Sequence, residues 1–144
     1  MASIEIRGIP ELMAKLGSVQ GNAVLRPPMQ RAVFRLQAGM AKYPRARAGS
    51  RYVRGRGTMN SRGVVTKLTS ENLGKKWTTK IDESAGGLVG KVGNNTSYGP
   101  FVQSQMFQAA VHQGLWQTDE DVAKKEEAAI VADFERTIGE ALAR

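Results

Sequence analysis

The sequence contains no cysteine, one histidine (His112) and only 6% aromatic residues. The absence of cysteine excludes disulfides, thiolate metal sites and cysteine nucleophiles. A single histidine excludes histidine-rich zinc sites, so a Ser-His-Asp hydrolase would have to be built around His112. No apolar run approaches the roughly 20 residues that span a bilayer, and residues 1–11 have no apolar signal-peptide core. We therefore expect no membrane partner and no secretion by that route.

Acidic side chains are missing from the stretch between Leu12 and Ser70. The same stretch carries twelve basic side chains: Lys15, Arg26, Arg31, Arg35, Lys42, Arg45, Arg47, Arg51, Arg54, Arg56, Arg62 and Lys67. Over residues 119–144 the balance is reversed, because eight acidic and four basic side chains give a local net charge of 4 − 8 = −4. Such a chain can place its acidic end against the basic flank of an identical neighbour, or offer its basic region to a polyanion. Both interpretations favour an assembly component over an enzyme.

Residues 44–63 contain six arginines, four glycines and hardly any apolar residue. This composition cannot bury enough surface to fold by itself, so we predict a long basic loop or arm. The spacing of its arginines around tyrosines suits contacts with successive phosphates, or with the acidic helix of a neighbouring subunit. The predicted subunit-interface or DNA-facing residues are Arg45, Arg47, Arg51, Tyr52, Arg54, Arg56 and Arg62.

Elsewhere the hydrophobic pattern predicts an α+β fold, in which a small antiparallel sheet packs against two or three helices. Alternating apolar residues at Ile4 and Ile6 indicate an edge strand, and residues 77–81 and 88–92 indicate a hairpin across a glycine turn. A length of 144 residues fits a single domain, residues 1–144, with an aliphatic core.

Two helices are expected in the N-terminal half of the chain. The first is brief and covers residues 11–16, because Gly17 is a typical helix stop. The second has Pro27 and Pro28 in its first turn. It should end by Tyr43, because the following proline disfavours helical geometry in the residue before it.

The clearest expected helix follows Thr118. This residue can cap the helix together with Asp121, and the acidic residues 119–121 lie at the positive end of the helix dipole. Its predicted core stripe comprises Val122, Ile130, Phe134, Ile138 and Leu142, widened by Ala123, Val131 and Ala141.

The sequence offers little for catalysis. The segment around Gly90 and Lys91 lacks the Ser or Thr and the first glycine of a phosphate-binding loop. A metal-dependent nuclease needs clustered carboxylates, and the basic region has none. We therefore predict that the chain is not an enzyme and has no catalytic, metal or cofactor site.

The order of short motifs carries a resemblance. A helix ending at Tyr43 is followed by Ser-Arg-Tyr-Val-Arg at residues 50–54 and by Leu-Gly-Lys-Lys-Trp at residues 73–77. At residues 92–103 a predicted strand ends in a glycine-asparagine turn before a tyrosine motif. In this order the chain resembles the tail-completion and neck (head–tail joining) protein family of long-tailed bacteriophages, which includes proteins like minor tail protein Z. The residues that carry the family motif are Trp77, Gly93, Asn94, Tyr98, Phe101, Val102 and Trp116.

The resemblance implies a virion structural protein of the phage neck, assembled in the host cytoplasm. It implies a ring of identical subunits around the DNA channel, for which we expect a hexamer. The implied neighbours are head-closure or connector proteins, tail-tube or tail-terminator proteins and the passing genomic DNA. Residues 55–59 depart from the family pattern and read as an insertion. Two alternatives remain: a cellular module that binds nucleic acid without sequence preference, and a toxin or small hydrolase built around His112.

Overall fold

A computed structural model provides the structure of the chain. It describes residues 2–4, 18–44, 52–53, 57–67, 72–84 and 87–143. The helix expected over residues 11–16 lies outside the described residues, as do Arg45, Arg47, Arg51, Arg54 and Arg56.

A three-stranded antiparallel sheet forms one layer of the fold. Its strands β1 (Ala2–Ile4), β6 (Gly87–Asn94) and β5 (Trp77–Ser84) follow the order β1-β6-β5. The β5–β6 pair runs in uninterrupted register from Trp77 opposite Asn94 to Ser84 opposite Gly87, which confirms the predicted hairpin. The edge strand expected around Ile4 is also present, paired with the outer side of β6.

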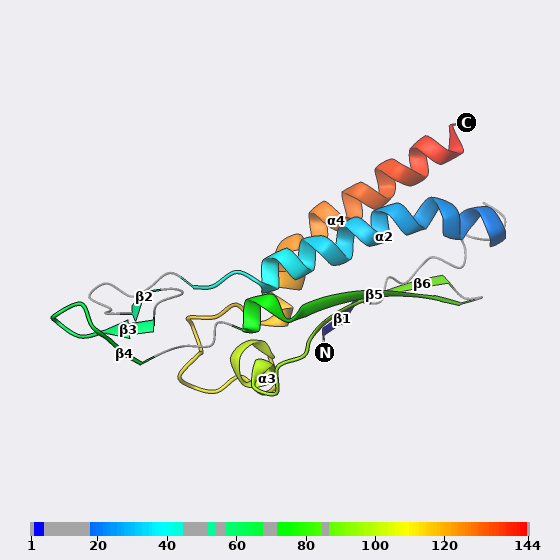
Figure 1. The fold of residues 1–144 in the computed structure, drawn as a ribbon. Helices are drawn as coiled ribbons and strands as arrows, with labels where there is room; N and C mark the ends of the chain where they lie inside the picture. Colours follow the sequence, from blue (N-terminus) through cyan, green and yellow to red (C-terminus); the bar gives the residue numbers. More distant parts are fainter. Residues whose placement is uncertain are drawn as a thin grey trace.

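Two long helices form the second part of the fold. Helix α2 (Ser18–Met40) lies along one face of the sheet, and helix α4 (Asp119–Leu142) runs back along α2 in the opposite direction (Figure 1). Helix α2 is therefore packed between the sheet and α4. This arrangement confirms the predicted α+β class, and we refer to these elements together with the short helix α3 (Gly99–Gln103) as the body.

Helix α2 begins nine residues before the two prolines that were expected in its first turn, so that expectation is wrong. A proline inside a helix removes a backbone hydrogen bond and costs about 3 kcal/mol. Tertiary contacts hold the extra turns in place. Leu25 is fully buried, and the side chains of Asn22 and Arg26 donate hydrogen bonds of 2.8 and 3.0 Å to Glu83 on β5.

The core is aliphatic and centres on α2. Its buried residues are Leu25, Met29, Ala32, Val33, Leu36, Met40, Leu88, Val92, Val122, Ile130 and Phe134. The helix approaches the sheet most closely at Gly90. A Cβ atom on Gly90 would lie 2.5 Å from Val33 Cγ1 and 2.7 Å from Met29 Sδ, so only glycine permits this spacing.

Helix α4 begins as predicted. Thr118 Oγ1 accepts a hydrogen bond from the amide of Asp121, and the Asp121 carboxylate accepts one from the amide of Thr118, which completes a capping box. The predicted core stripe is only partly correct, because Val131 and Leu142 are 48% and 58% exposed. Figure 1 shows that the C-terminal turns of α4 diverge from α2, the helix against which α4 packs.

A second small sheet lies outside the body. Its strands β2 (Tyr52–Val53), β3 (Gly57–Met59) and β4 (Val65–Lys67) pair antiparallel in the order β2-β3-β4. Figure 1 shows it apart from the helices and the larger sheet, and we call it the projecting sheet. The expectation of an unpaired loop over residues 44–63 is thus not confirmed. Composition indicates how much apolar surface a segment can bury. It does not indicate whether the backbone groups of the segment can hydrogen-bond to one another across tight turns.

Candidate assembly surfaces

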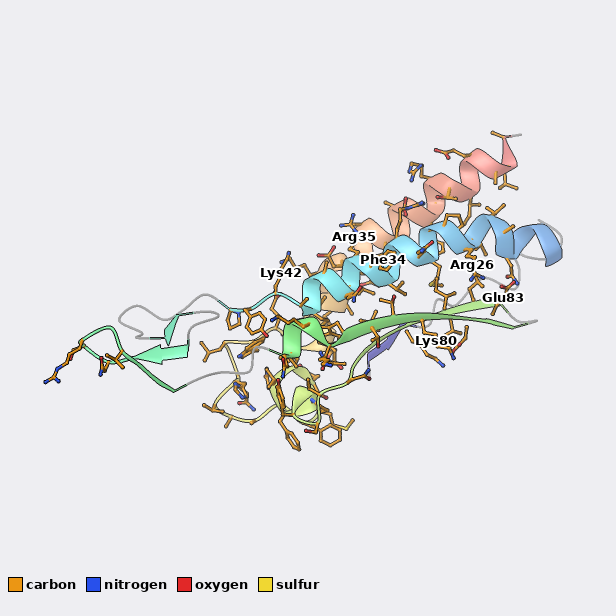
Figure 2. All side chains as sticks on the ribbon, in the orientation of Figure 1. Arg26, Phe34, Arg35, Lys42, Lys80 and Glu83 are labelled. Carbon is orange, nitrogen blue, oxygen red and sulfur yellow. The ribbon has the colours of Figure 1, made fainter. Side chains whose placement is uncertain are left out.

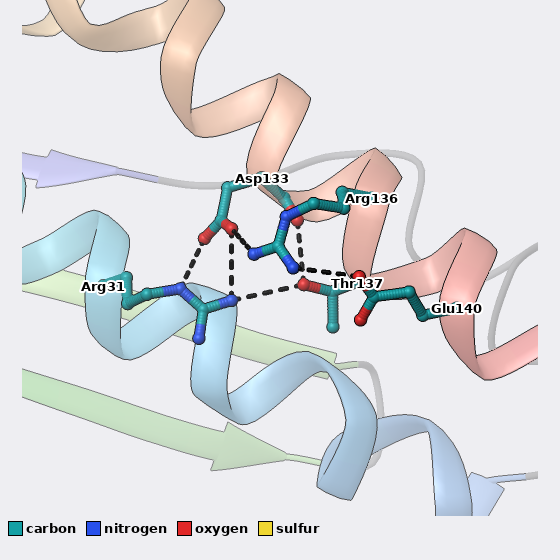
Figure 3. Close-up of polar contacts among 5 residues, drawn as sticks. All are labelled: Arg31, Asp133, Arg136, Thr137 and Glu140. Atoms are coloured by element: carbon teal, nitrogen blue, oxygen red, sulfur yellow. Dashed lines mark hydrogen bonds and ion pairs between the residues drawn. The ribbon is translucent and has the colours of Figure 1, made fainter.

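Acidic residues of α4 are neutralised inside the chain. Arg31 on α2 binds both carboxylate oxygens of Asp133, with Nε–Oδ2 at 2.7 Å and Nη2–Oδ1 at 3.2 Å. Figure 3 shows that Arg136 contacts the same carboxylate and that Thr137 receives a further hydrogen bond from Arg31. On the next turn of α2, Arg35 Nη1 lies 3.1 Å from Glu126 Oε2. Glu126 and Asp133 therefore already have basic partners within the chain.

Charged side chains also form ion pairs between α2 and the sheet, and within the sheet. Arg26 Nη1 lies 3.0 Å from Glu83 Oε2, so α2 is tied to β5 as well as to α4 (Figure 2). On the sheet, Lys80 and Lys91 both contact Asp82. Exposed pairs of this kind contribute roughly 0–1 kcal/mol each. Their main consequence here is that each of these basic side chains already has an acidic partner within the chain.

Three aspartates of the body, Asp82, Asp121 and Asp133, have pKa values below the usual range, and the last two hold α4. The pKa of Asp133 is lowered because Arg31, and then Arg136, donate hydrogen bonds to the ionised carboxylate. The pKa of Asp121 is lowered because the backbone amide and then the side chain of Thr118 bond to its carboxylate. Both groups therefore hold α4 in place most strongly in their ionised form.

The projecting sheet presents a different surface. Of the seven predicted contact residues in the arm, Tyr52 belongs to β2 and Arg62 lies in the turn between β3 and β4. The Arg62 side chain is exposed, and so is Val64, at 57%. Residues 44–67 carry seven basic and no acidic side chains. The arm thus has no acid of its own to neutralise its arginines.

The family-motif residues at the end of the hairpin form one hydrogen-bonded unit. Asn94 Nδ2 donates to the Leu73 carbonyl at 2.7 Å, and Asn94 Oδ1 accepts from the amide and the hydroxyl of Thr96 at 2.9 and 2.7 Å. Gly93 is buried opposite Thr78, and Trp77 is partly buried opposite Asn94. These residues therefore shape the turn that leads from β6 into α3.

The remaining motif residues divide between core and surface. Val102 is buried on α3, whereas Phe101 is 56% exposed and Tyr98, at the start of α3, is 39% exposed. The ring of Trp116 packs edge-on against Tyr43, with centroids 5.1 Å apart, and also lies edge-on to His112 at 6.4 Å. This packing ties the segment before α4 to the end of α2.

Sequence reasoning missed the apolar surface that follows α3. Met106, Phe107 and Val111 are 79%, 59% and 70% exposed, and Phe101 continues the same segment. Four large apolar side chains within eleven residues exceed what scattered surface positions usually show, and such patches mark contact sites. The sequence shows that these residues are apolar, but no pattern in it indicated that they face solvent.

An open groove of about 710 Å³ adjoins this surface, between the C-terminal half of α2, the sheet, α3 and the first turn of α4. We call it the α3 groove. Its apolar lining comes from Leu36, Met40, Val92, Met106, Phe107 and Val122, and the acidic side chains Asp119 and Glu120 also line it.

The wall of the α3 groove contains unsatisfied polar atoms. Trp77 and Gln103 line it, and Trp77 Nε1 and Gln103 Oε1 are buried without a hydrogen-bond partner among the described residues. The Gln103 amide nitrogen is used internally, because it donates to the Met40 carbonyl at 3.0 Å. Each unpaired buried group costs roughly 1–3 kcal/mol. The groove is therefore not optimised for the stability of the isolated chain.

The described residues contain no group of three or more His, Asp or Glu side chains placed to hold a metal ion. Within the same part of the chain, no helix combines the length and the apolar character needed to cross a membrane. Comparison with protein-family models finds no matching family, and searches for similar curated proteins and for similar solved structures find no match.

Proposed function

We propose that this chain is a structural protein of the neck of a long-tailed bacteriophage. Identical subunits form a ring around the DNA channel, and this ring joins the phage head to the phage tail. The observation that carries the proposal is the unequal treatment of charge. The body pairs its α2 arginines with its own acids, whereas residues 44–67 carry seven basic residues and no acid. A segment of this kind gains its counter-charge from a neighbour.

Two further observations support an assembly role. The projecting sheet makes little contact with the body, so its order depends on few contacts within the chain (Figure 1). The apolar surface at Phe101, Met106, Phe107 and Val111 is left to solvent in the single chain. Ring subunits need two such unlike surfaces, because a contact between different faces of identical subunits repeats around an axis.

The resemblance to the neck family adds the biological setting. Several of the residues on which it rests form a turn held by Asn94 and a short helix, and none of the seven motif residues is a histidine or a carboxylate. A scaffold motif of this kind suits a protein whose task is shape and contact. The proposed partners are other copies of the chain, the adjoining head-closure and tail proteins, and DNA in the channel.

Assembly is tested by measuring the mass of the purified protein and imaging it by electron microscopy. We expect rings. The triple variant Arg51→Glu/Arg54→Glu/Arg56→Glu should stay folded but lose ring formation, because like charges then face each other at the contact. The matched control Lys75→Glu/Lys76→Glu/Lys125→Glu changes the net charge equally on the exposed surface of the body and should keep the rings. A monomer at all concentrations, alone and with neck proteins, would contradict the proposal.

A second candidate function is non-specific nucleic-acid binding, which the acid-free basic segment also favours. If about six arginines contact phosphates, affinity should fall roughly 10³-fold between about 50 and 200 mM salt. A gel shift that shows this salt dependence with a monomeric protein would favour the second candidate. Rings that form without nucleic acid would favour the first.

A further inference from the structure

The tip of the projecting sheet is a rigid turn. Asn60 Oδ1 accepts hydrogen bonds from the amides of Arg62 and Val64 at 2.9 and 3.0 Å, and the Asn60 amide donates to the Val64 carbonyl at 2.9 Å. Gly63 has a φ of +75°, a left-handed conformation that favours glycine. Together with the bond from the Gly63 amide to the Asn60 carbonyl at 3.1 Å, four hydrogen bonds to one residue fix the backbone of the turn. A fixed turn loses little conformational freedom when it binds.

The turn presents one cationic and one aliphatic side chain to solvent. Arg62 is exposed, and Val64 is 57% exposed beside it. Figure 1 shows the β3–β4 connection at the end of the molecule farthest from the C-terminus of α4. A shape of this kind is suited to insertion into a recess on another molecule.

The α3 groove offers the complementary chemistry. Its lining is mainly apolar, and Asp119 and Glu120 supply carboxylates. Asp119 Oδ1 already accepts from the amides of Gln105 and Glu120 at 2.8 and 3.0 Å, so this carboxylate is held in place. Glu120 pairs with Lys124 at 2.9 Å, and both side chains are about half exposed or more. An exposed pair is weak, so a second cation can share or replace Lys124.

We propose that the α3 groove of one subunit receives the β3–β4 tip of a second copy of this chain, with Val64 on the apolar lining and Arg62 against Asp119 and Glu120. The tip and the groove are different surfaces of the same chain, so the contact is head-to-tail and generates a ring when its rotation closes. This inference rests on the proposed ring function and names the surfaces that form it.

Cysteine cross-linking tests the contact directly, because the chain has no cysteine of its own. The variant Val64→Cys/Gln105→Cys places one thiol on the tip and one on the exposed edge of the groove. Mild oxidation of its rings should give a ladder of covalent oligomers on a denaturing gel. The control Val64→Cys/Val131→Cys, with the second thiol on an exposed position of α4 away from the groove, should give no ladder beyond dimers.

Charge exchange supplies a second measurement that does not depend on thiols. Arg62→Glu should weaken self-association roughly tenfold or more, because a carboxylate then faces Asp119 and Glu120. Adding Glu120→Lys in the same chain should restore most of the loss. The single change Lys125→Glu, on the exposed face of the same helix, should have little effect.

The outcomes separate the two proposals. Rings without a specific ladder and without rescue by Glu120→Lys would overturn the tip-in-groove contact and leave the ring function standing. A chain that never self-associates would overturn both. An Arg62→Glu variant that assembles normally but loses DNA binding would assign the tip to nucleic acid and would also overturn the contact.

Discussion

The body and the projecting sheet use arginine in different ways. In the body, Arg31 and Arg35 lie one turn apart on α2 and each meets a carboxylate of α4 within 3.1 Å. In the projecting sheet, Arg62 lies at an exposed turn in a segment that contains no acid. The same residue type therefore contributes to packing in one region and stays available for a partner in the other. Charge counted along a sequence does not separate these two uses.

The largest expected difference between the regions concerns apolar truncation. Phe134→Ala removes a buried ring from between α4 and α2 and should lower the free energy of unfolding by about 3–5 kcal/mol. Val64→Ala, at the exposed tip, should change it by less than about 0.5 kcal/mol. Urea denaturation of both variants measures the difference. Similar losses would show that the tip belongs to the cooperative core after all.

Two glycine substitutions in the body should have opposite effects on its stability. Gly90→Ala places a Cβ against Val33 and Met29 and should cost about 1–3 kcal/mol, because α2 must move away from the sheet. Gly139→Ala, in α4, meets nothing within 4 Å and should stabilise the helix by up to about 1 kcal/mol. Thermal unfolding compares the two. Effects of the same sign would contradict the close α2–sheet packing.

Loss of a local hydrogen-bonded cap should lower global stability in the body, but should affect only the local stability of the turn in the projecting sheet. Thr118→Ala removes the capping box of α4 and should cost about 1 kcal/mol of global stability, because α4 is part of the core. Asn60→Ala removes the two side-chain hydrogen bonds of the tip turn and should leave global unfolding unchanged. Amide hydrogen exchange at residues 60–64 should instead become faster. A loss of global stability in the Asn60→Ala variant would show that the tip unfolds together with the body.

The smallest expected effect is the pH dependence of the Arg31–Asp133 contact. The folded-state pKa of Asp133 is lowered by Arg31, so this contact stabilises the chain above the usual carboxyl pKa of about 4 and is lost as pH falls through the lowered value. Asp133→Asn should therefore reduce the loss of Tm between about pH 5 and pH 2. The control Glu127→Gln, at an exposed position of α4, should not. If the dependence of Tm on pH is the same in Asp133→Asn as in the parent chain, the Arg31–Asp133 contact does not contribute to the stability of the body.

Local signals predicted those elements whose chemistry is short-range. Thr118 and Asp121 lie three residues apart and bond each other, so the start of α4 follows from sequence. The hairpin is equally local, because two alternating runs flank a glycine turn. The α+β class followed from these elements. Of the candidate site, the sequence identified Arg62 and the motif around Asn94 as notable residues.

Long-range contacts decided what these signals could not. The turns of α2 before Pro27 persist because Asn22 and Arg26 reach Glu83, roughly sixty residues away along the chain. The exposure of Val131 also depends on long-range contacts. Periodicity defines the apolar face of a helix, but it does not define how much of that face a neighbouring element covers. Likewise, no sequence pattern placed Met106 and Phe107 beside Asp119 in one groove.

The sequence by itself determined the segregation of charge, the aliphatic core and the caps and turns, because each depends on composition or on residues a few positions apart. Only the tertiary structure decided which charges are already paired, which apolar residues stay exposed and where a groove opens. The physical reason is that pairing and burial are properties of surfaces brought together from distant parts of the chain. In this protein, α4 meets α2, and Asp133 is thereby paired with Arg31 from a position about a hundred residues away.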